Sequence, residues 1–238
     1  MLELEARAEP SRLMAWASPL LAVALMLVGG LAVFAALGKD PVEGFRVFFL
    51  NPVKDLYALS ELLLKATPLM LCAIGLAIGF RANVWNIGAE GQFMLGAVAA
   101  TGVALYFGDA ESALVLPAMV LAGAAGGAAW AAIPALLRTR FNANEILVSL
   151  MLVYVAQLFV SWLVFGPWKD PDGFNFPQTR MFAEAATLPM VIEGTRLHFG
   201  FAIALAALVA GYAFINRSHA GFRMRVAGEA ADAARYAG

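Results

Sequence analysis

The sequence predicts an all-α integral membrane protein with about six transmembrane helices. Hydrophobic residues fill 62% of the 238 positions and charged residues only 14%, whereas soluble domains are typically about half apolar and a quarter charged. Residues 13–38 and 146–168 contain no charged side chain. Each run can cross ~30 Å of hydrocarbon as a helix that rises ~1.5 Å per residue, so the pattern argues against a soluble protein.

The first apolar run is interpreted as a retained transmembrane helix. Arg7 and Arg12 precede it, as basic residues precede the apolar part of a cleaved secretory signal. The run exceeds the roughly 7–15 apolar residues of such a signal, however, and further spans follow it. A cleaved signal peptide is therefore the weaker interpretation.

Apolar runs between charged residues place the other spans. The six predicted spans are residues 15–37, 66–80, 91–107, 113–137, 146–168 and 199–215. The second and third are short, and the polar residues 81–90 separate them.

The distribution of arginine and lysine predicts a cytoplasmic N-terminus. In that orientation nine basic residues are cytoplasmic and seven are external, so the short loops decide. Residues 108–112 contain two acidic residues and no basic one, whereas residues 138–145 contain two arginines. The cytoplasmic set is Arg7, Arg12, Arg81, Arg138, Arg140, Arg217, Arg223, Arg225 and Arg235.

Two long segments are predicted on the external side. Within the first, residues 45–50 and 56–64 are expected to lie along the membrane interface as amphipathic helices. The second, residues 169–198, is expected to form an external cap or docking surface. Its prolines, Pro171, Pro177 and Pro189, prevent one long helix.

The most informative segment is residues 80–96 (FRANVWNIGAEGQFMLG), where two Asn, one Glu and one Gln stand among three glycines between two short spans. Because unpaired polar groups are costly in hydrocarbon, these side chains are expected to face protein or a water-filled cavity, as in the broken helices of transport sites. The residues alone support an alternative interpretation equally well: a plain cytoplasmic loop with Glu90 at a helix start, where the helix dipole favours a carboxylate.

Two glycine pairs have the small-xxx-small spacing that lets membrane helices approach closely, Gly75 with Gly79 and Gly123 with Gly127. Helix packing is the favoured interpretation, and a role in a substrate path is the alternative.

At the start of the fifth span, Asn142 or Asn144 is expected to cap the helix, with Glu145 in its first turn. Capping is favoured over a direct functional contact.

The C-terminal residues 216–238 are predicted to be cytoplasmic, basic at first and then alanine-rich, with charges spaced for a short surface helix. Glu229 and Asp232 near its start and Arg235 near its end suit the helix dipole. A membrane-surface anchor and a helix offered to a cytosolic partner are both open interpretations.

No pattern in the sequence predicts catalysis, a metal, a cofactor or a nucleic-acid partner. Cys72 is the single cysteine, and His198 and His219 fall on opposite sides of the predicted membrane. The glycines of residues 80–96 lack both the Lys-Ser/Thr ending of a P-loop and the dinucleotide spacing. No basic patch is interleaved with aromatic residues, as nucleic-acid binding would require.

Residues 80–96 and 221–238 (GFRMRVAGEAADAARYAG), with 141–156 (FNANEILVSLMLVYVA) between them, resemble permeases of ABC importers in the branched-chain amino-acid and simple-sugar superfamily. Within it the likeness to the nucleoside-type branch is greatest, and it covers almost the whole chain. The resemblance implies passage of a small polar solute, nucleosides or simple sugars, through a multi-pass protein of the bacterial inner membrane. It also implies that the chain is not an enzyme and that a cytosolic ABC ATPase drives it. The other implied partners are a second homologous permease subunit and an extracytoplasmic solute-binding lipoprotein.

The resemblance also assigns roles to residues. It implies a place near the translocation pathway for Asn83, Trp85, Asn86, Glu90 and Gln92. It implies that residues 218–238 form a cytoplasmic coupling segment, with a short coupling helix that docks in a groove of the ATPase. The positions expected to contact the ATPase are Gly221, Arg223, Arg225, Gly228 and Glu229. Family members continue with further spanning helices, so residues 1–238 are expected to be the N-terminal two thirds of a longer permease.

Two other function classes were weighed against this one. A secondary transporter or channel would also use broken helices, but ion-coupled carriers usually place ionisable groups within a span, whereas Glu90 lies at the end of one. An intramembrane enzyme would need a nucleophile with a base, or a metal site, and the predicted spans contain no His and no Asp.

Overall fold

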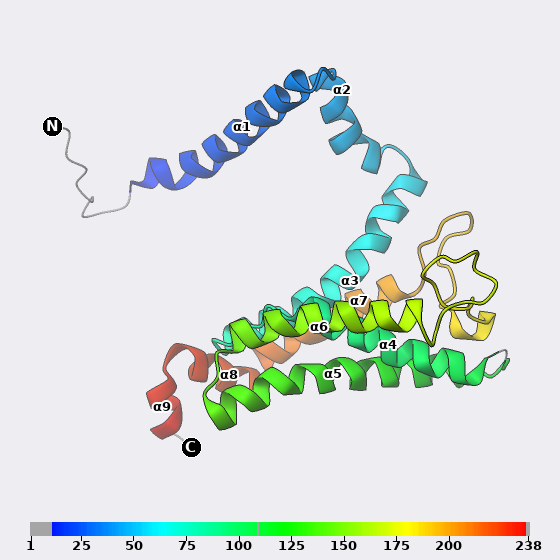
Figure 1. The fold of residues 1–238 in the computed structure, drawn as a ribbon. Helices are drawn as coiled ribbons and strands as arrows, with labels where there is room; N and C mark the ends of the chain where they lie inside the picture. Colours follow the sequence, from blue (N-terminus) through cyan, green and yellow to red (C-terminus); the bar gives the residue numbers. More distant parts are fainter. Residues whose placement is uncertain (1–10, 109, 237–238) are drawn as a thin grey trace. The chain divides into compact units, whose positions relative to one another are not determined.

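A computed structural model describes residues 11–108 and 110–236, and its elements are helices joined by turns and irregular segments (Figure 1). The chain divides into two units, Met1–Leu62 and Leu63–Gly238, and the boundary falls within helix α3. Arg7, which belongs to the predicted cytoplasmic set, lies outside the described residues.

The first unit begins with α1 (Arg12–Ala36), which is apolar throughout its middle. The Ser11 hydroxyl caps it by accepting a hydrogen bond from the Met14 amide at 3.4 Å. A short helix α2 (Pro41–Phe45) follows and continues into a π-helical turn, η1 (Arg46–Leu50), and a 3-10 turn, η2 (Asn51–Val53). The predicted helical character of residues 45–50 is therefore confirmed, and their place at a membrane interface stays a prediction.

The next helix, α3 (Leu56–Arg81), is longer than the sequence suggested. Residues 56–64 are its first turns, so the prediction of a separate interfacial helix there was wrong. The Asp55 carboxylate starts the helix by accepting from the Ala58 amide at 2.7 Å. Lys65 does not end it, because the flexible stem of one lysine can carry its charge to water while the helix continues.

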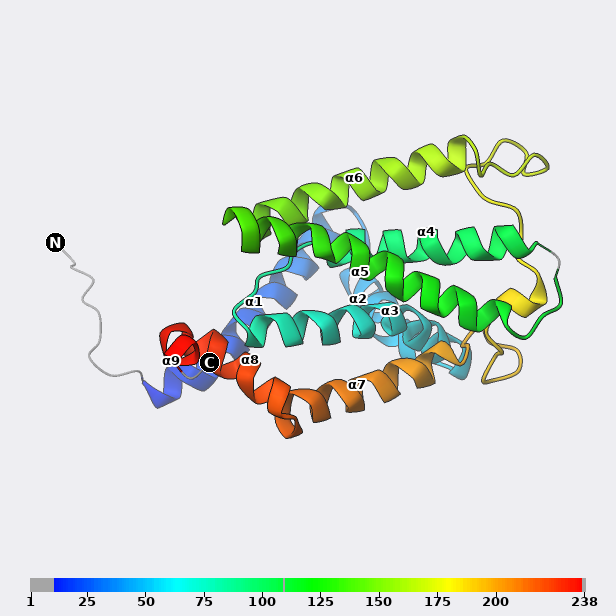
Figure 2. The same ribbon diagram turned by 90° about the horizontal axis from the view of Figure 1, so that it is seen from below.

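In the second unit, the rest of α3 is followed by α4 (Ala89–Phe107), α5 (Val115–Phe141), α6 (Glu145–Phe165) and α7 (Gly200–Arg217) (Figures 1 and 2). Helices α4, α5 and α6 pack on one another, and α7 lies against α3 where Gly211 meets Ile74. Two short helices, α8 (His219–Glu229) and α9 (Ala231–Tyr236), complete the unit. The connections 82–88 and 142–144 lie at the same end as α8, and residues 166–199 lie at the other end. This alternation agrees with the predicted order of loops.

Five of the described helices are long and apolar enough to cross a membrane. They are Leu13–Ala36, Leu56–Arg81, Val115–Phe141, Glu145–Phe165 and Gly200–Arg217. Helix α4 is not among them, since its first turn contains the polar residues Glu90 and Gln92, so the count of six spans stays a prediction. Large apolar side chains on the other helices are exposed, as lipid contact requires: Trp16 by 79%, Leu158 by 72% and Val209 by 69%.

Glycines allow α4 and α5 to cross in close contact. A Cβ atom on Gly96 would lie 2.9 Å from the Gly123 carbonyl oxygen, and one on Gly127 would lie 3.1 Å from the Gln92 carbonyl oxygen. The predicted packing role of Gly123 and Gly127 is confirmed. The same prediction was wrong for the other pair: among the described residues, a Cβ atom on Gly75 would meet nothing within 4 Å, and one on Gly79 would meet the Val84 carbonyl oxygen of the next connection at 3.4 Å and no other helix.

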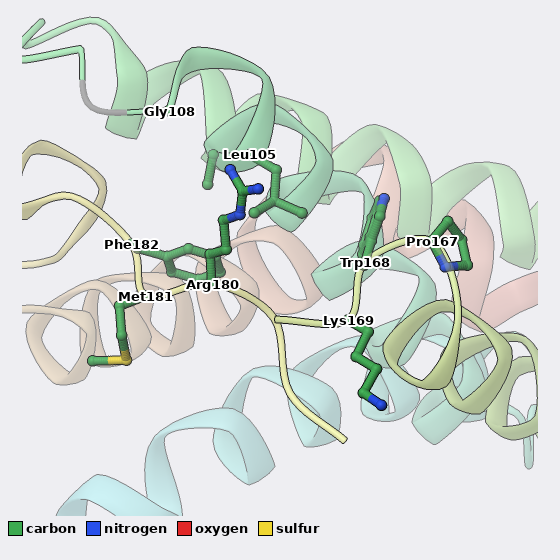
Figure 3. Close-up of a pocket in the computed structure, with 9 residues that line it drawn as sticks. Leu105, Gly108, Pro167, Trp168, Lys169, Arg180, Met181 and Phe182 are labelled. Atoms are coloured by element: carbon green, nitrogen blue, oxygen red, sulfur yellow. The ribbon is translucent and has the colours of Figure 1, made fainter. Parts of the chain in front are cut away.

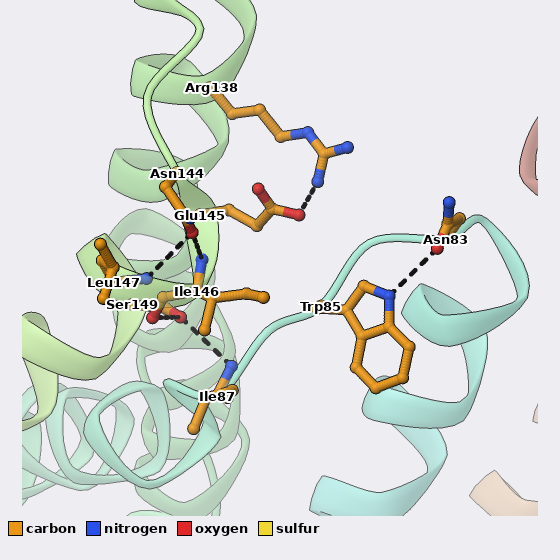
Figure 4. A network of polar contacts seen from close by, with 9 residues as sticks. All are labelled: Asn83, Trp85, Ile87, Arg138, Asn144, Glu145, Ile146, Leu147 and Ser149. Carbon is orange, nitrogen blue, oxygen red and sulfur yellow. Dashed lines mark hydrogen bonds and ion pairs between the residues drawn. The ribbon is translucent and has the colours of Figure 1, made fainter.

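The connection between α5 and α6 uses its two asparagines differently. Asn142 has a φ of +51° and ends α5 in the left-handed conformation, which asparagine tolerates better than most residues. The Asn144 side chain caps α6 by accepting from the amides of Ile146 at 3.0 Å and Leu147 at 3.3 Å (Figure 4). Capping by one of the two candidates is thus confirmed, and an ion pair between Arg138 and Glu145 joins the two helix ends.

The segment between α6 and α7 is irregular, apart from the 3-10 turn η3 (Glu184–Ala186) and a single bridge between Met190 and His198. The prediction that its prolines prevent a long helix is confirmed. Ala186 is buried against Ala104, Val115 and Met119, so the segment is anchored on α4 and α5.

Candidate functional site

Two adjoining surface hollows, both open to their surroundings and called cavities below, lie beside α4 in the second unit. The larger, of about 670 Å³, is lined by α4, α5, residues 186–198 and Leu71 of α3. The smaller, of about 310 Å³, lies between α3 and the start of α4. They share the lining residues Leu71, Gln92 and Phe93. Both volumes are of the size that accommodates small molecules.

The smaller cavity has a polar wall formed by two amide side chains. The Asn86 amide nitrogen donates to the Gln92 side-chain oxygen at 3.0 Å, and the Gln92 amide nitrogen donates back to the Asn86 oxygen at 3.2 Å. The Gly88 backbone amide also donates to the Asn86 oxygen at 2.9 Å, which fixes the orientation of both amides. The other lining residues are Leu71, Cys72, Gly75, Leu76, Ala89 and Phe93.

These amides lie inside the bundle because α4 begins well within it. The Gln92 carbonyl oxygen packs against Gly127, which stands 14 positions before Phe141, the last residue of α5. At ~1.5 Å per residue, α5 therefore extends ~21 Å beyond this contact. Residues 82–88 occupy part of the space that α4 leaves. The Ile87 amide is anchored there, donating to the Ser149 hydroxyl of α6 at 3.2 Å.

Glu90, also predicted near the pathway, points to α6 instead. Its carboxylate accepts a hydrogen bond from Gln157 at 3.3 Å, and it lines neither cavity. The side chains of Glu90 and Gln92 point to nearly opposite sides of α4. They are two positions apart, and successive positions of an α-helix are rotated by ~100°.

Asn83 and Trp85 lie outside both cavities as well. They are exposed and bond to each other, with the Trp85 indole nitrogen donating to the Asn83 oxygen at 3.0 Å (Figure 4). The Trp85 ring packs against Phe80, with 5.1 Å between the ring centroids. Of the five predicted pathway residues, the structure therefore brings only Asn86 and Gln92 together at a cavity.

Several residues at this site had not been singled out from the sequence. Cys72, Phe93 and Leu71 are apolar or weakly polar positions in apolar runs, so their residue type gave no signal. The spacing of Gly75 was interpreted as helix packing. Gln157, the partner of Glu90, is an isolated polar residue within a predicted span, and this polarity is a signal for a buried contact.

The predicted coupling residues fall into two groups. Arg223 and Glu229 are exposed on α8, whereas Gly221, in the first turn of the same helix, is buried against the end of α7. A Cβ atom on Gly221 would lie 2.2 Å from the Phe214 carbonyl oxygen, so only glycine fits this turn. The last two residues of the predicted segment, 237 and 238, lie outside the described part of the chain.

Gly228 allows α8 to pack closely against the end of α3. A Cβ atom there would lie 2.3 Å from the Arg81 carbonyl oxygen and 3.0 Å from the Ala82 carbonyl carbon. Arg225, one turn earlier, is partly buried, and its Nε atom has no hydrogen-bond partner among the described residues. α8 therefore touches the segment that leads to Asn86.

The outward surface of the two short helices contains a groove of about 580 Å³, lined by Phe222, Arg223, Met224, Val226 and their neighbours His219, Ala227 and Ala234. It is mostly apolar with a basic edge. This groove and the exposed side chains of α8 are suited to contact with another protein.

A further pocket of about 320 Å³ lies at the opposite end of the bundle, between the end of α4 and residues 167–182 (Figure 3). Trp168 and Phe182 form part of its wall, and Lys169 and Arg180 supply two positive charges that point in different directions. Lys169 donates to the Asn175 side chain. Within residues 11–108 and 110–236, no cluster of three His, Cys, Asp or Glu side chains could hold a metal ion.

Comparison with known proteins identifies the chain's relatives. Residues 58–238 match a family described as the branched-chain amino acid transport system permease component. The chain belongs to this family. The match includes α3 from its third residue onward and every later element, so it contains both cavities and α8.

Named relatives are permease proteins of ABC transporters. The chain is 40% identical to the glucose ABC transporter permease protein TsgB13 of Haloferax volcanii, over all of this chain and 64% of the relative. It is 30% identical to the guanosine ABC transporter permease protein NupP of Bacillus subtilis, over 92% of this chain and 63% of the relative. The chain thus spans a little under two thirds of the length of these relatives. No solved structure matches the chain significantly.

Proposed function

We propose that this multi-pass chain is a permease subunit of an ABC importer and forms part of the translocation pathway for a neutral polar solute, a nucleoside or a simple sugar. The observation that carries the proposal is the pair of adjoining cavities that meet at Gln92 within a membrane-type bundle. Relatives named for glucose and guanosine support the substrate class. In this proposal ATP hydrolysis belongs to a partner protein.

The chemistry of the smaller cavity supports a neutral solute, whereas the larger cavity includes one arginine, Arg196, in its wall. None of the residues that line the smaller cavity is charged, and its polar atoms belong to two uncharged amides. A fixed charge in a low-dielectric cavity would favour a counter-ion, whereas amides offer hydrogen bonds without that bias.

The coupling part of the proposal assigns residues 218–238 to the cytoplasmic side, where α8 and α9 would meet the ATPase. Support comes from the exposed Arg223 of α8, the groove that it lines and the contact of Gly228 with the end of α3. The N-terminus would then be cytoplasmic in a cell-membrane protein. The pocket with Lys169 and Arg180 would face outward, toward a solute-binding protein, and a second permease subunit would complete the pathway.

Uptake by the reconstituted transporter tests this proposal. The permease, its ATPase and its solute-binding protein are placed in liposomes, and uptake of radiolabelled guanosine and glucose is followed with ATP, without ATP and with an imposed ion gradient. ATP-dependent uptake of one solute together with solute-stimulated ATP hydrolysis is expected. Uptake driven by an ion gradient alone would overturn the proposal in favour of a secondary transporter.

Cys72, the one cysteine in residues 1–238, provides a direct reporter of the pathway. Cys72 is partly accessible and lines the smaller cavity, so a charged thiol reagent in water should modify it at a rate that changes between ATP-free and ATP-trapped states. The matched control is Val209→Cys in a Cys72→Ser background, because Val209 is 69% exposed on α7 and would face lipid. The pathway assignment fails if Cys72 is as unreactive as this control in every state.

A further inference from the structure

The Asn86–Gln92 pair has hydrogen-bonding capacity that the described residues leave unused. The Asn86 oxygen already accepts from Gly88 and from Gln92, so both of its lone pairs are occupied. Each amide nitrogen donates one of its two hydrogens within the pair. Two N–H donors and one lone pair on the Gln92 oxygen therefore remain, at the wall of the smaller cavity.

An apolar surface stands beside this polar edge. Phe93 is 53% exposed and lines both cavities next to Gln92. A ring-shaped solute could rest one face on the aromatic ring while its polar groups reach the amides, which is a common arrangement in small-molecule sites.

We propose that Asn86 and Gln92, with Phe93, form a subsite that selects the vicinal diol of a neutral sugar ring. Two neighbouring hydroxyl groups supply two acceptors for the free N–H groups and one donor for the free lone pair, which matches the unused capacity of the pair. A free sugar and the ribose of a nucleoside both carry such a diol. The proposal rests on the proposed function for the pathway and adds the chemical group that the pathway recognises.

Protection of Cys72 tests this subsite without a binding protein, which would otherwise impose its own selectivity. The full-length permease is reconstituted in nanodiscs, and the rate of Cys72 modification is measured against increasing guanosine, 2′,3′-dideoxyguanosine, glucose and 2,3-dideoxyglucose. The diol-bearing compounds are expected to protect at concentrations at least about tenfold lower than the matched dideoxy compounds, since a site built to bond hydroxyl groups rejects analogues that lack them. Protection by guanosine alone or by glucose alone identifies which source of the diol is used.

Substitutions then assign the selectivity to the pair. Gln92→Met keeps the length of the side chain and Asn86→Ala removes the second amide, and each should bring the diol and dideoxy compounds to within about threefold of each other. Gln92→Leu is a second variant in case one does not fold. Gln178→Leu, an exposed amide in the external segment that lines neither cavity, should retain the full preference.

Three results would overturn the subsite: equal protection by diol and dideoxy compounds, no protection by either diol source, or an unchanged preference in folded Gln92 variants. Each is distinct from failure of the proposed function. That failure would appear as absence of ATP-driven uptake in the complete transporter, whereas diol-selective protection of Cys72 requires no ATPase.

Discussion

Replacing Gly228 by alanine should separate α8 from the end of α3. The added Cβ atom would stand 2.3 Å from the Arg81 carbonyl oxygen, and Cβ atoms essentially never approach another atom closer than 3.0 Å. The contact must therefore open from 2.3 Å to at least 3.0 Å, a movement of 0.7 Å or more. The opposing atom is backbone, so no side chain can rotate away to make room.

Overpacking of this kind typically costs about 1–3 kcal/mol, which would lower the ratio of packed to displaced α8 by about 5- to 150-fold. We expect ATP-driven uptake by the Gly228→Ala transporter to fall, by at most this factor, while the amount of assembled permease changes little. Uptake by proteoliposomes is the assay, with assembly measured by size-exclusion chromatography.

Gly29→Ala is the matched control, because a Cβ atom on Gly29 would meet nothing within 4 Å. Alanine within α1 should stabilise that helix by about 0.5–1 kcal/mol and leave uptake unchanged. Wild-type uptake by a folded Gly228→Ala protein would refute the reasoning, because close packing of α8 on the end of α3 would then not be needed for transport.

Two further substitutions examine the bundle. Gly96→Ala should lower stability by about 1–3 kcal/mol, because its Cβ atom would press on the Gly123 carbonyl oxygen at 2.9 Å; an unchanged thermal unfolding midpoint in detergent would contradict this. Asn144→Ala should destabilise the start of α6 by about 1 kcal/mol through loss of its two capping bonds, whereas Asn144→Asp should retain them, and equal midpoints for the two variants would rule out the capping role.

The sequence predicted the helical bundle well because lipid imposes strong constraints on composition. Charge-free runs marked α1 and α6, and the prolines of residues 169–198 marked the irregular path of that segment. The error at α3 came from treating Lys65 as the end of an apolar run. A helix tolerates one lysine, since the side chain can place its charge at the membrane surface.

The candidate site was predicted only in part, because segment composition does not tell which face each residue occupies. Asn86 and Gln92 meet at a cavity, whereas Glu90, two residues before Gln92, points to Gln157 of α6. Similarly, Gly75 and Gly123 occur in the same sequence spacing, but only Gly123 meets a neighbouring backbone. To distinguish such glycines, one must know which face of each helix meets a neighbouring helix.

Residues 82–88 connect α8 with the amide pair at the smaller cavity, two regions that the sequence did not link. At one end Gly228 of α8 rests on the backbone of Arg81 and Ala82, and at the other Ile87 is bonded to Ser149 of α6. Asn86 lies directly before this second anchor and holds Gln92 at the cavity. Because the segment is short and tied at both ends, a displacement of α8 must be absorbed by the turn at Asn83, where φ is +54°, or be passed on to Asn86. Movement of α8 and the position of the amide pair are therefore linked through a few residues of one connection.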